Sequence, residues 1–259
     1  MRDDEVVLDR RHPALELAQV LGGAELTGEL LLPRAQAGEV VRNVRERDDR
    51  LLVEPVRRVL RVAAGRTYRG RDYPIEADAS AAAYPFCAAA IAGGRVRVEG
   101  IAPDSLQPDY RLLGILEKMG CRVVRGSDWV EVEGPQRLLP VDVDMNDLPD
   151  AALALAVVAL FADGPSHIRN VPNLRIKETD RLAALEAELR RLGADARAGA
   201  DDLRIAPGPL RGACIRTYDD HRMAMSFALA GLRVPGVAIQ DPGCVSKTWP
   251  EYFEMLERL

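Results

Sequence analysis

Apolar residues follow two different patterns in the helical segments of this chain. One segment, which begins at Asp180, carries an apolar stripe on a single face: Leu182, Leu185, Leu189 and Leu192. This spacing predicts an amphipathic helix with one buried face. Three other segments are rich in alanine and are apolar on nearly every side: 80–92, 149–162 and 220–232. A helix that is apolar all round is typical of a protein interior, so these three are expected inside the fold.

The two kinds of helix alternate in a repeat of about seventy residues. Each small-residue helix leads to a short strand and then to a second helix, which starts near Asp109, Asp180 or Pro250. The second helices end on similar sequence near Leu116, Leu189 and Leu256, and the first two continue through a glycine into two short strands. The segment Thr248-Trp-Pro-Glu251 matches a capping box ahead of the last helix.

This repeat defines the fold that we expect. Its period is longer than that of common solenoid repeats, which favours a compact threefold arrangement over an extended array. The prediction is an α/β fold of three similar units, with buried helices inside and sheets and amphipathic helices around them. Residues 73–259 would form this part. Residues 1–72 are dense in arginine and acidic residues, show weak periodicity, and are expected to form a separate, weakly defined unit.

The composition of the chain argues against several classes of protein. The chain has 259 residues, 47% hydrophobic and 29% charged, which is typical of a globular protein. A net charge of -5 argues against a general nucleic-acid binder. The longest apolar run, 151–162, is too short to span a bilayer, and the first residues do not resemble a signal peptide. Four cysteines without C-x-x-C spacing favour reduced thiols, so a cytoplasmic protein is expected.

Charged residues gather where the predicted helices begin. The cations among them are Lys177, Arg181, Arg222 and Lys247. Because helix starts have unpaired N–H groups and the positive end of the helix dipole, they suit phosphate and carboxylate groups. The pattern therefore predicts a site for a doubly charged small molecule. Lys177 and Lys247 are two of only three lysines in the chain, which indicates either a specific need for a compact ammonium group or chance.

Each of these residues also has a simpler interpretation. Asp150 and Asp180 fit ordinary helix caps. Lys177 could be solvated, and Arg222 could pair with Asp219. Asp219-Asp-His221 suggests a metal site, but adjacent residues at a helix start point in different directions, so no metal is expected. These alternatives stay open at the level of residue patterns.

Four long motifs decide which interpretation to prefer: D-M-N-D-L-P-D (144–150), R-I-K-E-T-D-R-L (175–182), T-Y-D-D-H-R-M-A-M (217–225) and D-P-G-C-V-S-K-T-W-P-E-Y-F (241–253). In this order they resemble the signatures of the EPSP synthase (3-phosphoshikimate 1-carboxyvinyltransferase) family. The resemblance runs from about Gly65 to Leu259 and covers the family's carboxyl-terminal lobe. It implies three βαβαββ units with pseudo-threefold symmetry, and it makes residues 1–72 a remnant of the amino-terminal lobe.

The resemblance also implies an activity and roles for particular residues. The family transfers the enolpyruvyl group of phosphoenolpyruvate to the 5-hydroxyl of shikimate 3-phosphate, without a metal or an organic cofactor. By position, Asp150 matches the general base, and Glu178 matches the acid that protonates the methylene carbon. Asp150, Asn173 and Lys177 match positions that contact shikimate 3-phosphate. The family positions that hold phosphoenolpyruvate correspond to Arg181, Arg222 and Lys247.

Part of the family's site is not recognisable in this chain. The amino-terminal lobe of the family supplies further lysine, arginine and serine contacts, and residues 1–72 contain no clear counterpart. Three hypotheses follow. The chain is a truncated copy or fragment of an EPSP synthase, or one chain of a split enzyme completed by a second chain or by its own dimer. The third is a non-catalytic binder of phosphorylated acids, or a different reaction on the same scaffold. A related transferase acting on UDP-N-acetylglucosamine fits the motifs less well.

Overall fold

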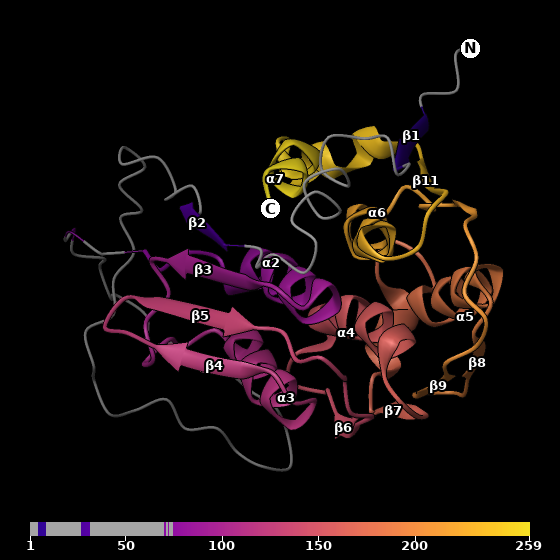
Figure 1. The fold of residues 1–259 in the computed structure, drawn as a ribbon, viewed down its shortest axis with the longest axis horizontal. Coiled ribbons are helices and arrows are strands. Elements are labelled where there is room, and N and C mark those ends of the chain that lie inside the picture. The colour runs from indigo at the N-terminus through magenta and orange to yellow at the C-terminus, as the bar shows by residue number, and fades with distance from the viewer. Residues whose placement is uncertain (1–4, 9–26, 32–69, 71, 73–74) are drawn as a thin grey trace, which may run out of the picture. The chain divides into compact units, whose positions relative to one another are not determined.

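The computed structural model describes residues 5–8, 27–31, 70, 72 and 75–259 (Figure 1). The predicted unit 1–72 thus falls almost entirely outside the described residues, and its boundary stays a prediction. Apart from the described residues between 33 and 77, these parts of the chain belong to one compact unit. The following description concerns that unit.

The alanine-rich segments form buried helices, as the sequence predicts. They are α2 (Ala79–Ala92), α4 (Ala152–Val158) and α6 (His221–Ala228). Short 3₁₀ segments flank the last two: η2 (Pro149–Ala151), η3 (Ala159–Phe161) and η5 (Leu229–Leu232). Every residue of α4 is buried. α4 packs against α2 and α6, and η5 packs against α2, so these helices form the centre of the unit (Figure 1).

The second helix of each repeat is partly exposed and follows a 3₁₀ turn. These elements are η1 (Pro108–Arg111) with α3 (Leu112–Lys118), η4 (Pro172–Ile176) with α5 (Arg181–Leu192), and η6 (Pro242–Lys247) with α7 (Tyr252–Arg258). The predicted leucine stripe of α5 is fully buried. The expected capping box before α7 is wrong: that helix begins at Tyr252 without a side-chain cap, because the backbone N–H of Thr248 already donates to the Val245 carbonyl.

Two four-stranded sheets share one topology. The strands of the first are β2 (Thr27–Leu31), β3 (Arg95–Glu99), β4 (Arg122–Arg125) and β5 (Trp129–Glu133), in the order β2-β3-β5-β4. The second contains β6 (Asp142–Asp144), β7 (Ser166–Arg169), β8 (Asp195–Ala198) and β9 (Leu203–Ala206), in the order β6-β7-β9-β8. In each, the first pair is parallel and the others are antiparallel. This connectivity is that of a βαβαββ unit.

The third sheet is completed by the other end of the chain. β10 (Cys214–Ile215) runs parallel to β11 (Val237–Gln240), as in the other two sheets. β1 (Glu5–Leu8) then pairs antiparallel with β11, in the place that β5 and β9 take beside β3 and β7. Two strands from the range 1–72 therefore belong to sheets of the repeat.

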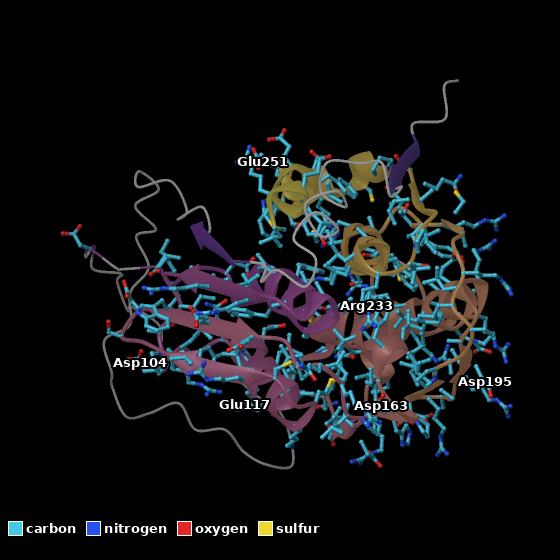
Figure 2. All side chains as sticks on the ribbon, in the orientation of Figure 1. Asp104, Glu117, Asp163, Asp195, Arg233 and Glu251 are labelled. Atoms are coloured by element: carbon cyan, nitrogen blue, oxygen red, sulfur yellow. The ribbon has the colours of Figure 1, made fainter. Side chains whose placement is uncertain are left out.

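Exposed polar side chains lie along the sheet that contains β6, β7, β8 and β9. Asp195, at the start of β8, is exposed and points away from the buried helices (Figure 2). Among the described helices, none has both the length and the apolar character needed to cross a membrane. All four cysteines carry free thiols, and Cys87 and Cys121 are buried.

Candidate active site

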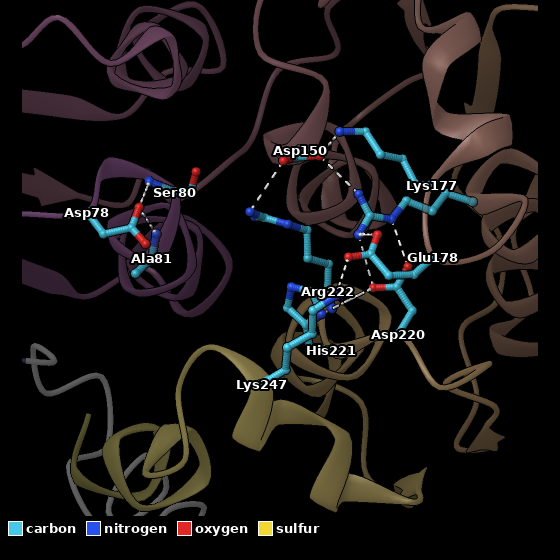
Figure 3. Close-up of polar contacts among 11 residues, drawn as sticks. Asp78, Ser80, Ala81, Asp150, Lys177, Glu178, Asp220, His221, Arg222 and Lys247 are labelled. Atoms are coloured by element: carbon cyan, nitrogen blue, oxygen red, sulfur yellow. Dashed lines mark hydrogen bonds and ion pairs between the residues drawn. The ribbon is translucent and has the colours of Figure 1, made fainter.

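The motif residues come together where the starts of several helices meet (Figure 3). Asp150 lies in η2, just before α4, and Lys177 and Glu178 lie in the turn that joins η4 to α5. Arg181 is the first residue of α5. Arg222 is the second residue of α6, and Lys247 is the last residue of η6. Five of the six are linked by ion pairs through Asp150 or Arg181, and the sixth, Lys247, joins them through Glu178.

Arg181 is the hub of this network. Its side chain is 1% exposed. Its Nε and Nη2 atoms donate to the two carboxylate oxygens of Asp220, at 2.7 and 3.1 Å. Nη1 donates to Asp150 at 2.9 Å, and Nη2 also donates to Glu178 at 2.7 Å. A buried guanidinium is tolerated only when carboxylates compensate its charge. The burial of Arg181 therefore depends on its contacts with these three acids.

The carboxylate of Asp150 forms ion pairs with three cations. Besides Arg181, its carboxylate lies 3.3 Å from Lys177 Nζ and 3.3 Å from Arg222 Nη2. Burial raises the pKa of Asp150, but the charges of Arg222, Lys177 and Arg181 lower it more, so the pKa lies below its ordinary value. At neutral pH Asp150 is therefore an ionised carboxylate that can accept a proton.

The simpler interpretations can now be compared with the geometry. Asp150 is not a cap, because η2 and α4 begin without a side-chain cap hydrogen bond. Asp180 is one, since its carboxylate accepts from the N–H of Ala183. Lys177 pairs with Asp150, and Arg222 pairs with Asp150 and not with Asp219 as considered.

Glu178 bridges two cations. Lys247 Nζ donates to one carboxylate oxygen at 2.8 Å, and Arg181 donates to the other at 2.7 Å. The hydrogen bond from Lys247 is the main reason that the pKa of Glu178 falls from 4.5 to about 2; burial opposes this shift. Glu178 is thus held as an anion by the same two cations that the motifs connect with a ligand.

This pKa predicts how stability depends on pH. Because the folded pKa of Glu178 is lower than its unfolded value, its stabilising effect is present above pH 4.5 and is lost between pH 4.5 and about 2. The side chain is partly exposed, so the effect should stay below about 1 kcal/mol. In urea unfolding, the stability difference between the wild type and Glu178→Gln should shrink as pH falls through this window. A difference that stays constant over the window would contradict the ion pairs described here.

Asn173 lies in η4, and η4 contacts η2, the element that contains Asp150. Its amide oxygen is buried and has no hydrogen-bond partner among the described residues. An unsatisfied buried polar atom is costly, which is consistent with a ligand contact at this position.

Three further residues belong to the site and were not assigned to it from the sequence. Asp220, considered only within a metal motif, is fully buried, caps α6 and holds Arg181. Burial raises the pKa of Tyr84 to about 12, with Arg222 opposing the shift. Asp109 also has a raised pKa, mainly through burial, and again Arg222 opposes it. Two short segments that weakly resemble the family offered a signal: E-A-D-A-S (76–80) lies shortly before Tyr84, and D-S-L-Q-P-D (104–109) ends at Asp109. Within the ion-pair network itself, the four cations contact three carboxylates, those of Asp150, Glu178 and Asp220.

The fold can now be compared with known structures. It resembles an EPSP synthase from Acinetobacter baumannii with a TM-score of 0.67 and 26% identity, over 75% of this chain and 48% of that chain. It also resembles the enolpyruvyl transferase NikO from Streptomyces tendae, with a TM-score of 0.58 and 25% identity, over 71% and 43% of the two chains. The fold class is therefore that of the enolpyruvyl transferases.

Sequence comparison narrows the class to one family. The family model for EPSP synthase (3-phosphoshikimate 1-carboxyvinyltransferase) matches residues 42–256, and the chain belongs to this family. A 3-phosphoshikimate 1-carboxyvinyltransferase from Nostoc sp. is 50% identical over 192 residues, which is 74% of this chain and 45% of the relative. One from Nitrosomonas europaea is 56% identical over 185 residues, or 70% and 43% of the two chains. The chain thus spans about half the length of the curated relatives that it matches.

Proposed function

We propose that this chain takes part in the transfer of the enolpyruvyl group of phosphoenolpyruvate to the 5-hydroxyl of shikimate 3-phosphate, with release of phosphate. One observation carries the proposal: the four cations of the motifs converge on Asp150 and Glu178 in a single network. The curated relatives bear the name of this activity. Since the chain covers about half their length, its own activity, substrates and partners are part of the proposal.

In this proposal Asp150 is the general base. Its pKa is lowered by three cations, so it is ionised and can take the proton of the 5-hydroxyl as that oxygen attacks phosphoenolpyruvate. Lys177 is the cation suited to the phosphate of shikimate 3-phosphate, with Asn173 beside it. When that phosphate pairs with Lys177 in place of Asp150, Asp150 loses a positive neighbour. The pKa of Asp150 then rises, and the carboxylate becomes a stronger base.

Glu178 would protonate the methylene carbon of phosphoenolpyruvate. A pKa of about 2 makes it a carboxylate at neutral pH in the unliganded site. If the phosphate and carboxylate of phosphoenolpyruvate engage Lys247 and Arg181, they remove the two partners that lower this pKa. Ligand binding itself would then raise the pKa of Glu178 and prepare it to carry a proton.

Arg181, Arg222 and Lys247 are the proposed holders of phosphoenolpyruvate. Their fixed charges would also stabilise the tetrahedral intermediate, which keeps both anionic groups until phosphate leaves, the methyl group loses a proton and the double bond re-forms. Arg181 differs from the other two, because its donors are already shared among three carboxylates. Nη1 has one further N–H donor, so a ligand gains a second hydrogen bond from Arg181 only if Glu178 or Asp150 turns away. No metal and no organic cofactor enter the proposal, and the expected place of action remains the cytoplasm.

A second candidate is the binding of phosphorylated acids without catalysis, because four cations that can hold an anion lie together in this site. A second chain that supplies the family's other lobe would instead make this one half of a split enzyme. The two hypotheses differ in what happens when such a chain is added.

The test is a phosphate-release assay with both substrates, run on the 259-residue chain alone and together with a chain carrying the other lobe. Alone, it is expected to show little or no turnover but to retain weak binding of phosphoenolpyruvate. Losing two charge-assisted hydrogen bonds at about 1.5–3 kcal/mol each would weaken binding by roughly 10²- to 10⁴-fold. Release restored by the second chain favours the split enzyme. Failure to bind either substrate in any combination would refute both candidates.

A further inference from the structure

A second buried carboxylate lies on α5, outside the cluster described above. Glu188 is seven residues after Arg181, two helical turns away on nearly the same face. Its side chain is 0% exposed. None of the ion pairs of the candidate site involves it, and the proposed chemistry does not use it. A fully buried acid is expensive unless its hydrogen bonds are satisfied, so its partners indicate its purpose.

Two of those partners lie in the segment that leads into α6, and the third lies on α5 itself. One oxygen of Glu188 accepts a hydrogen bond from the Tyr218 hydroxyl at 2.8 Å. The other accepts from the backbone N–H of Arg216 at 3.3 Å, and from Arg191 Nε on its own helix at 2.8 Å. Burial, the hydrogen bond and the charge of Glu188 together raise the pKa of Tyr218 to about 12, so the phenol keeps its proton and remains a donor.

Tyr218 has an uncommon backbone conformation. It and Asp219 have φ angles of 57° and 56°, in the left-handed region. For most residues other than glycine, such as Tyr218, this conformation costs on the order of 1–2 kcal/mol; it costs less for an aspartate such as Asp219, and it persists where surrounding contacts enforce it. Two such residues in succession need an external hold. The contacts of Glu188 on Tyr218 and Arg216 supply one.

The residues that follow this strained pair belong to the candidate site. Asp220 caps α6 and binds Arg181, and Arg222 reaches Asp150. α5 therefore holds the segment 216–222 at two places: Arg181 binds Asp220, and two turns later Glu188 binds Tyr218. The contact with Arg181 holds Asp220, at the start of α6. The contact with Glu188 holds Tyr218, in the turn that precedes α6.

We propose that Glu188 is a positioning residue, which holds Tyr218 and Asp219 in the left-handed conformation so that Asp220 and Arg222 are aimed into the site. It touches no reacting group and acts through the turn. The proposal rests on the proposed function only in that phosphoenolpyruvate serves as the probe of Arg222.

The test combines Glu188→Gln with Tyr218→Gly in a double-mutant cycle. In the wild-type background, Glu188→Gln should weaken phosphoenolpyruvate binding about tenfold in calorimetry, because one contact to a charged acceptor is lost. In the Tyr218→Gly background it should have little effect, since glycine adopts the positive φ without strain and the phenol is already gone. The matched control is Glu186→Gln on the same helix: Glu186 pairs with Arg190 and should leave affinity unchanged.

A second measurement does not depend on the ligand. Amide hydrogen exchange at Asp220 and Arg222, whose N–H groups donate to the Thr217 carbonyl and to the Asp220 side chain, should become about tenfold faster in Glu188→Gln. If the wild-type chain alone does not bind phosphoenolpyruvate, the weak binding expected under the proposed function is wrong, and exchange alone decides about Glu188. The proposal is overturned if exchange is unchanged. The proposal is also overturned if Glu188→Gln lowers the melting temperature and weakens phosphoenolpyruvate binding by the same factor in both backgrounds. The same holds if Glu188→Gln leaves the affinity for phosphoenolpyruvate unchanged in the wild-type background.

Discussion

Replacing Arg181 with methionine is expected to lower the free energy of unfolding by about 3–5 kcal/mol, because it leaves a buried charge without its partner. Asp220, which is 0% exposed, would lose both hydrogen bonds that Arg181 now donates to its carboxylate. Methionine fills a similar volume, so the change tests the charge and not the packing. Urea and thermal unfolding followed by circular dichroism measure it.

Two further variants make this prediction specific. Arg190→Met removes another arginine of α5, but Arg190 is 51% exposed and pairs with Glu186 four residues earlier, so a cost below about 0.5 kcal/mol is expected. In the double variant Arg181→Met with Asp220→Asn, the buried charge is gone as well, and much of the lost stability should return. An Arg181→Met protein within about 1 kcal/mol of the wild type would show that Asp220 finds another partner or is not buried.

Replacing Arg222 with alanine is expected to abolish measurable binding of phosphoenolpyruvate, whereas Asp150→Asn should leave binding largely intact. Arg222 is among the cations proposed to hold the ligand, and each charge-assisted hydrogen bond contributes about 1.5–3 kcal/mol. Asp150 is an anion, and a base is not needed to hold the ligand. Neutralising it also frees Arg222 and Lys177 from their ion pairs at 3.3 Å. Calorimetric titration of the two variants gives the comparison.

The matched control for lost positive charge is Arg137→Ala. Arg137 is 78% exposed and pairs with Asp163, outside the candidate site, so its removal should not change affinity. If Arg222→Ala binds phosphoenolpyruvate as tightly as the wild type while remaining folded, Arg222 does not hold this ligand. If Asp150→Asn instead loses binding, Asp150 organises the cations and the division of roles proposed here is wrong.

The sequence by itself determined the repeat and the kind of each helix. The leucine stripe of α5 and the all-apolar composition of α4 are local patterns, and burial of one face or of every face follows from them. The same holds for Asp180 as a cap, because capping involves residues within one turn. Long motifs in a fixed order identified the family and the residues that the structure brings together.

Only the tertiary structure decided which distant partners meet. That β1 completes the third sheet beside β11 could not be predicted, because strand pairing is a long-range contact and nothing in four residues specifies it. The same reason applies to the charges. Asp219 is nearer to Arg222 in sequence than Asp150 is. The backbone of Asp219 is left-handed, however, and Arg222 pairs with Asp150 at the start of another helix. Ion pairs depend on distance in space and on burial, and the packing of α4, α5 and α6 sets both.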